Sequence, residues 1–291
     1  MKHYLQLMRP ANLVTSVADI IAGVALSGIS FSFGISFLEM LFLLCFSSIG
    51  LYGGGVVFND IFDAKLDSIE RPERPIPSGK VTLKNAIILG ILLLMIGLIF
   101  AYFVSSISFV IALLIGILAL FYDKFGKHLT IFGPINMGLC RGGNLLLGIS
   151  IVPSAVQEWY WIAIIPIIYI AAITIISRSE VHGGAKSTLY LAAVLYITIN
   201  ICQLIVAEQF GNLYLAIPFI LLHIVLILIP LTKALKNPIG PNIGKAVKAG
   251  VLALIVMDAA WVAISGNFFA AIAVLILLPV SIIIAKTFAV T

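Results

Sequence analysis

The sequence predicts an all-α membrane protein, a polytopic bundle of nine to ten transmembrane helices that form one domain over residues 1–291. Hydrophobic residues make up 62% of the chain and charged residues only 10%, which is more apolar than a soluble domain of this length can bury. Apolar stretches recur at about 18 to 23 residues, the helix length that crosses a hydrocarbon core. The basic residues collect in alternate loops, as the positive-inside rule requires.

Ten apolar stretches are long enough to be considered as spans. They cover approximately residues 12–29, 37–58, 82–104, 107–122, 131–149, 159–177, 187–207, 213–231, 245–264 and 267–288. Segments that contain charged residues, proline or glycine separate most of these stretches and set their predicted boundaries.

The distribution of charge supports ten spans independently of hydropathy. Every one of the 17 Lys and Arg residues except Arg141 falls on the same predicted side, whereas the opposite loops hold Glu39, Glu158 and Glu208. We therefore expect both termini and the basic loops to be cytoplasmic, in the inner (cytoplasmic) membrane of a bacterium. Topology also explains the net charge of +5, and no nucleic-acid partner is expected.

The N-terminal stretch has some features of a cleaved signal peptide, because Lys2 and Arg9 precede an apolar run that contains small residues. We favour an uncleaved first span. Arg9-Pro10 fits the start of a helix at the membrane interface, since proline is tolerated in the first helical turn.

The second stretch ends in a group of acidic and amide residues. At helical spacing Asn59, Asp63 and Asp67 stack along one face, and Asp60 borders them. Carboxylates this close repel one another unless a cation lies between them, and Mg²⁺ prefers one or two carboxylates together with phosphate oxygens and water. The segment therefore predicts a magnesium-diphosphate site. The alternative is a polar loop where a helix leaves the membrane.

The loop that follows, residues 68–80, contains three prolines and a glycine, which predict an ordered turn. Such a turn would hold Arg71 and Arg74 near the acidic group, where guanidinium groups bind phosphate oxygens well. Alternatively, these arginines anchor the interface or pair with Glu70 or Glu73.

These residues resemble the UbiA superfamily of membrane prenyltransferases, which has an Asn-Asp-x-x-Asp-x-x-x-Asp motif and a following Arg-Pro loop. Here the motif is Asn59 to Asp67, and the loop is Arg74-Pro75-Ile76-Pro77-Ser78-Gly79. Arg71-Pro72-Glu73-Arg74-Pro75 and the last pair of spans most resemble the EboC-like branch. The resemblance implies a prenyl diphosphate donor and Mg²⁺ bound by Asn59, Asp60, Asp63 and Asp67.

The resemblance implies two further elements. The family's Tyr-x-x-x-Lys element is approximate here, so that Tyr122 and either Lys124 or Lys127 are expected to bind the diphosphate. The second acidic motif, expected after the sixth span, is reduced to Glu180, with Arg178 and His182 beside it. Glu180 would then be the remaining ligand of a second metal site, which holds fewer metal ions or uses fixed positive charge.

Several polar residues fall inside the spans, where an unpaired polar group is costly. We favour a structural ion pair of Arg141 with Asp19 or Asp258. The alternative is that Arg141 and Asn144, at spacing i, i+3, line a cavity and orient the acceptor. His223, alone in an apolar span, is expected to form an interhelical hydrogen bond.

Two functions are consistent with the sequence. The first is Mg²⁺-dependent transfer of an isoprenyl group from a prenyl diphosphate to a hydrophobic acceptor in the bilayer, with Asp60, Asp63 and Asp67 as catalytic residues. The second is a prenyl-lipid binding protein or carrier that retains the donor site without catalysis, which the reduced second acidic motif favours. The acceptor could be an aromatic ring, a tetrapyrrole or a glycerol phosphate.

Overall fold

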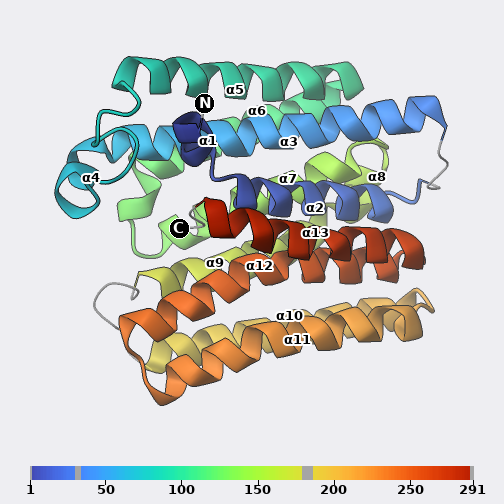
Figure 1. Ribbon diagram of the computed structural model, residues 1–291. Coiled ribbons are helices and arrows are strands. Elements are labelled where there is room, and N and C mark those ends of the chain that lie inside the picture. The colour runs from blue at the N-terminus through green and yellow to red at the C-terminus, as the bar shows by residue number, and fades with distance from the viewer. Residues whose placement is uncertain (1, 30–33, 179–185, 289–291) are drawn as a thin grey trace.

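The computed structural model describes residues 2–29, 34–178 and 186–288, and the helices of this part lie side by side as a bundle (Figure 1). Every predicted span coincides with a helix or a group of consecutive helices. These are α2 (Pro10–Leu26), α3 (Ile35–Phe62), α5 (Leu83–Val104), α6 (Ser106–Lys124), α7 (Phe132–Ile149), α8 to α9 (Ala155–Trp159, Tyr160–Ala163 and Ile164–Ser177), α10 (Lys186–Gln209), α11 (Leu213–Lys236), α12 (Gly240–Ile264) and α13 (Phe268–Thr287).

In the described part of the chain, eight of these segments are long and apolar enough to cross a membrane. The other two, α2 and α7, have 17 and 18 residues and contain much of the buried polar chemistry, including Asp19 and Arg141. Length and hydropathy therefore identify eight of the ten predicted spans, and the two remaining helices carry buried charged side chains.

The short segments lie at the ends of the bundle. Helix α4 (Ala64–Glu70) and the turn between α11 and α12 lie at one end, and α8 lies at the other (Figure 1). Helix α1 (Lys2–Met8) precedes α2 and packs on α3. The acidic motif thus lies at the end of the bundle that also holds the Lys-containing α11–α12 turn.

Packing places α2, α7 and α12 in the interior. Helix α2 contacts α3, α7, α12 and α13, and α7 also contacts α6 and α9. Helix α12 is the most enclosed of the long helices, whereas most side chains of α5 and α13 lie on the outside of the bundle. The outer surfaces are apolar, as expected for helices that face lipid.

Two glycines allow α2 and α7 to meet backbone to backbone. A Cβ atom on Gly23 would lie 2.3 Å from the carbonyl oxygen of Leu145, and one on Gly148 would lie 2.4 Å from that of Ile20. No side chain fits at either position, so small residues set the approach of these helices. The approach brings Asp19 of α2 against Arg141 of α7.

Candidate functional site

The acidic motif does not form one straight helical stripe. Helix α3 ends at Phe62, and α4 begins at Ala64, with Asp63 between them at φ −86° and ψ 0°. The backbone N–H groups of Asp63 and Asp67 still donate to the carbonyls of Asn59 and Asp63, at 3.0 and 2.8 Å. The side chains of the motif pair with two different sets of partners.

The first set joins α3 to the end of α6. Asn59 donates from Nδ2 to Oδ1 of Asp123 at 2.9 Å, and Lys127 donates from Nζ to Oδ1 of Asp63 at 2.5 Å. Asp63 follows Asn59 by four residues, and Lys127 follows Asp123 by four residues, so the second contact lies next to the first. Lys127 belongs to the short 3-10 helix Gly126–His128 after α6.

The second set joins Asp60 and Asp67 through arginines. Nη1 of Arg74 lies 2.7 Å from Oδ2 of Asp67 and 3.4 Å from Oδ1 of Asp60, and Nη2 of Arg9 lies 2.9 Å from the same Asp60 oxygen. Both carboxylates are buried. Because they share one guanidinium nitrogen, the two carboxyl groups lie close together, and the Pro-rich loop that carries Arg74 folds back over the motif.

Sequence reasoning missed Arg9 as a site residue. It lies directly before α2 with φ 48° and ψ 68°, the one positive φ of a non-glycine residue in the described chain. The helix start expected at Arg9-Pro10 is confirmed, because Pro10 is the first residue of α2. The pairing with Asp60, which is 51 positions away, has no local sequence signal.

Three other residues expected to bind the diphosphate, Lys124, Arg71 and Arg178, do not pair through their side chains with the acidic motif among the described residues. Lys124 is exposed and stacks over the Phe125 ring, with Nζ 5.1 Å from the ring centroid, so it does not share the site with Lys127. Arg71 follows α4 as its C-cap residue and is partly exposed. Arg178 donates to the carbonyls of Thr130 and Leu129 at 2.6 and 2.7 Å and thereby fixes the loop after Lys127.

The second acidic motif is not placed by the structure. Glu180 and His182 lie outside the described residues, so the metal role expected for Glu180 stays a prediction.

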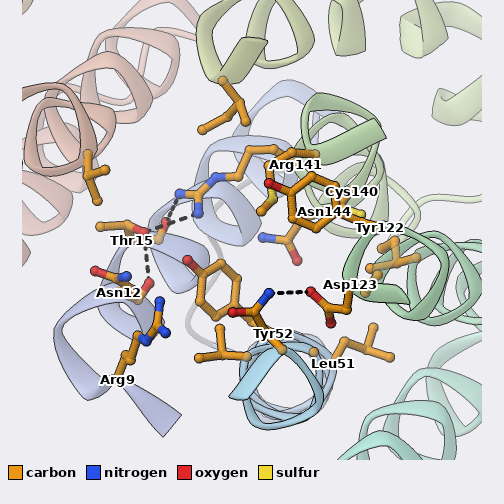
Figure 2. A pocket seen from close by; sticks show the side chains of 18 of the residues that line it. Arg9, Asn12, Thr15, Leu51, Tyr52, Tyr122, Asp123, Cys140, Arg141 and Asn144 are labelled. Carbon is orange, nitrogen blue, oxygen red and sulfur yellow. Dashed lines mark hydrogen bonds between the residues drawn. The ribbon is translucent and has the colours of Figure 1, made fainter. Parts of the chain in front are cut away.

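A cavity of about 290 Å³ lies beside the acidic motif, because Asn59 of the motif lines it. Figure 2 shows most of the side chains that surround it. Arg9, Asn59, Tyr122 and Asp123 line it near the motif. Its other walls come from α2, α3, α6, α7, α9 and α12, and they include the apolar side chains of Leu51, Ile115, Met137, Ile170 and Leu254. The charged side chains of Arg9 and Asp123 therefore border a cavity with mainly apolar walls.

One inner wall of the cavity is polar. Arg141 lies with Nε 2.5 Å from Oδ2 of Asp19, which confirms the predicted ion pair, and its Nη1 and Nη2 donate to Oγ1 and the carbonyl of Thr15 at 3.1 and 2.6 Å. Asn144 donates to Asp19 at 2.9 Å and to the carbonyl of Ser16 at 2.8 Å. Arg141 and Asn144 also line the cavity, as predicted (Figure 2).

His223 lies apart from this cavity. Its Nδ1 lies 2.9 Å from Oδ1 of Asn200, which joins α11 to α10. The prediction that it forms an interhelical hydrogen bond is confirmed.

The carboxylates suit a magnesium ion that arrives with its substrate. In the described residues, no three His, Cys, Asp or Glu side chains converge as a metal-ion group. Asp60, Asp63 and Asp67 instead hold cationic side chains, which a diphosphate would attract. Mg²⁺ usually binds one or two carboxylates and completes its shell with phosphate oxygens and water, so this donor set fits a Mg²⁺-diphosphate complex better than an isolated ion.

Comparison with known proteins extends these observations. The family model described as "UbiA prenyltransferase family" matches residues 20–238. A digeranylgeranylglyceryl phosphate synthase of Methanosarcina mazei is 37% identical over 159 residues, which cover 51% of this chain and 54% of that protein. The matched region thus spans about half the length of that relative.

Solved structures share the fold. The apo structure of a UbiA homolog from Aeropyrum pernix K1 superimposes with a TM-score of 0.71 at 17% identity, covering 85% of this chain and 96% of that one. A UbiA homolog from Archaeoglobus fulgidus bound to GPP and Mg²⁺ gives a TM-score of 0.56 at 14% identity, with 93% and 99% covered.

Proposed function

Because this chain belongs to the UbiA prenyltransferase family, we propose that it transfers an isoprenyl group from a prenyl diphosphate to a hydrophobic acceptor within the membrane, with Mg²⁺. The observation that carries the proposal is the junction of an acidic and basic cluster with a mainly apolar cavity. The cluster suits a metal-bound diphosphate, and the cavity suits an isoprenyl tail.

The residues of the cluster divide into two roles. Asp60, Asp63 and Asp67, with support from Asn59, would hold Mg²⁺, which when bound offsets the charge that develops on the leaving diphosphate. Arg9, Arg74 and Lys127 would release their carboxylates and bind phosphate oxygens.

The reaction breaks the bond between the first prenyl carbon and the diphosphate oxygen, and the electron pair leaves with the diphosphate. A nucleophilic atom of the acceptor then bonds to that carbon and loses its proton. The apolar walls near Leu51, Ile115 and Ile170 keep water away from the prenyl cation. The wall of Thr15, Arg141 and Asn144 would orient a polar end of the acceptor.

For the acceptor we propose a glycerol phosphate lipid, because the relatives are named digeranylgeranylglyceryl phosphate synthase. The placement in the EboC-like branch rests on the Arg71-Pro72-Glu73-Arg74-Pro75 loop and the last pair of spans alone. We further propose that the motif end of the bundle faces the cytoplasm, since the basic loops flank it.

Lys124, the last residue of α6, and Lys127 after it distinguish a binding role from ordinary loop charge. Lys127→Ala removes the cation that contacts Asp63, so we expect it to weaken binding of Mg²⁺-pyrophosphate about tenfold, as for the loss of one charge-assisted hydrogen bond. Lys124→Ala removes an exposed lysine three residues away and should change the affinity less than twofold. Calorimetric titration of both variants makes the comparison, and equal losses would refute the assignment.

The function itself is tested with purified protein, geranylgeranyl diphosphate, Mg²⁺ and geranylgeranylglyceryl phosphate. We expect release of pyrophosphate together with a larger prenylated lipid, detected by mass spectrometry. Donor binding without pyrophosphate release for any tested acceptor class, including aromatic and tetrapyrrole compounds, would favour the non-catalytic carrier instead.

A further inference from the structure

Asp123 has a carboxylate oxygen that the ion pairs of the site do not use. It lies in the last turn of α6 and is 4% exposed. Its Oδ1 accepts the hydrogen bond of Asn59, at 2.9 Å. Its Oδ2 is buried and has no hydrogen-bond partner among the described residues, although the side chain lines the cavity (Figure 2).

A buried carboxylate oxygen without a partner is costly, and native proteins satisfy such groups with a donor, a water or an ion. Of the lysines of the same segment, Lys127 is already bonded to Asp63 and Lys124 lies over the Phe125 ring. A cation is a ligand that could meet Oδ2 and bind a diphosphate at the same time, because it attracts both anionic groups.

We propose that Asp123 is a ligand of the metal ion that accompanies the diphosphate, acting across the site from Asp63 on the other helix. This inference rests on the proposed function. Asn59 contacts Asp123, and Asp63, which follows Asn59 by one turn, contacts Lys127, which follows Asp123 by four residues, so the two carboxylates belong to neighbouring pairs between the same two segments. Two protein carboxylates completed by phosphate and water are the usual shell of Mg²⁺.

The proposal gives the site a second acidic wall. The acidic motif expected after the sixth span contains only Glu180. A carboxylate on α6 would supply metal coordination opposite α3 without additional aspartates in that segment. Asp123 would thus compensate for the reduced motif.

The test uses Mn²⁺ as the metal and inorganic pyrophosphate as the anion, so that neither prenyl chain length nor acceptor matters. In Asp123→Asn, the amide oxygen can still accept the hydrogen bond from Asn59, while an uncharged amide nitrogen replaces Oδ2. We expect the Mn²⁺ concentration for half-maximal pyrophosphate binding to rise at least about tenfold. Glu158→Gln, an exposed carboxylate at the opposite end, is the matched control and should behave as the wild type.

Two further measurements distinguish coordination from a structural role. The thermal midpoint of the ligand-free Asp123→Asn protein should not fall, because the variant removes a buried charge and keeps the hydrogen bond. Asp123→Glu retains a carboxylate and should bind Mn²⁺ more tightly than Asp123→Asn does, so that the ranking of the two variants reports on charge even if both lose some stability.

The outcomes separate this inference from the proposed function. If the wild type binds pyrophosphate with Mn²⁺ and Asp123→Asn has the same Mn²⁺ midpoint, Asp123 is only a hydrogen-bond acceptor for Asn59 and the inference is overturned. If the wild type shows no Mn²⁺-dependent binding at all, the proposed function fails together with it.

Discussion

Asp63→Ala should lower the rate of prenyl transfer by at least about a hundredfold, with binding of the donor no longer dependent on Mg²⁺. Asp63 is the carboxylate that holds Lys127, and it lies where α3 gives way to α4. Its removal takes away a proposed metal ligand, and stabilisation of the leaving group by one such interaction is worth several kcal/mol. Single-turnover assays with labelled geranylgeranyl diphosphate measure the rate.

The control for this variant is Glu73→Ala, which removes an exposed carboxylate from the neighbouring loop and should retain the wild-type rate. Because the Asp63 side chain is 20% exposed, its loss should change stability little. Transfer by Asp63→Ala at the wild-type rate would exclude a metal role for this residue.

Arg141→Met should produce the largest loss of stability. The Asp19 side chain is 1% exposed, and its Oδ2 lies 2.5 Å from Nε of Arg141. Removing the guanidinium leaves a buried carboxylate without its cation, which typically costs about 3 kcal/mol or more. Unfolding in detergent with a graded denaturant measures the change, and Lys233→Met, an exposed cation at the end of α11, should stay within about 0.5 kcal/mol of wild type.

A double variant tests the cause of that loss. Asp19→Asn in the Arg141→Met background removes the stranded charge, so the double variant should be more stable than Arg141→Met alone. Additive destabilisation by the two changes would show that the ion pair is not the source of the effect.

Hydropathy and charge could predict the ten helices, because each span is an apolar run bounded by loop residues and each basic loop marks one side. The end of α3 at the acidic motif was also predictable. The partners of each side chain there were not, since Asn59 and Asp63 pair with residues 64 positions away, whereas Asp60 and Asp67 pair with arginines.

Pairings between distant segments could not be deduced from one sequence. Arg9 and Asp60 are 51 positions apart, and Asn59 and Asp123 are 64 apart. Lys124 and Lys127 both looked able to reach the site, and the choice depends on the 3-10 turn after α6, which has no strong sequence signal. The sequence shows Asp123 as a carboxylate in the last turn of an apolar helix, but only the fold shows that this residue lines the cavity and that its Oδ2 is buried without a partner among the described residues.

The most direct test of the central claim is equilibrium binding of labelled geranylgeranyl diphosphate to the purified wild-type protein, in Mg²⁺ and in chelator. The cluster of Asp60, Asp63 and Asp67 beside an apolar cavity predicts saturable binding in Mg²⁺ that is lost in chelator. Binding that is absent, or that is equally strong without metal, would contradict a magnesium-dependent donor site.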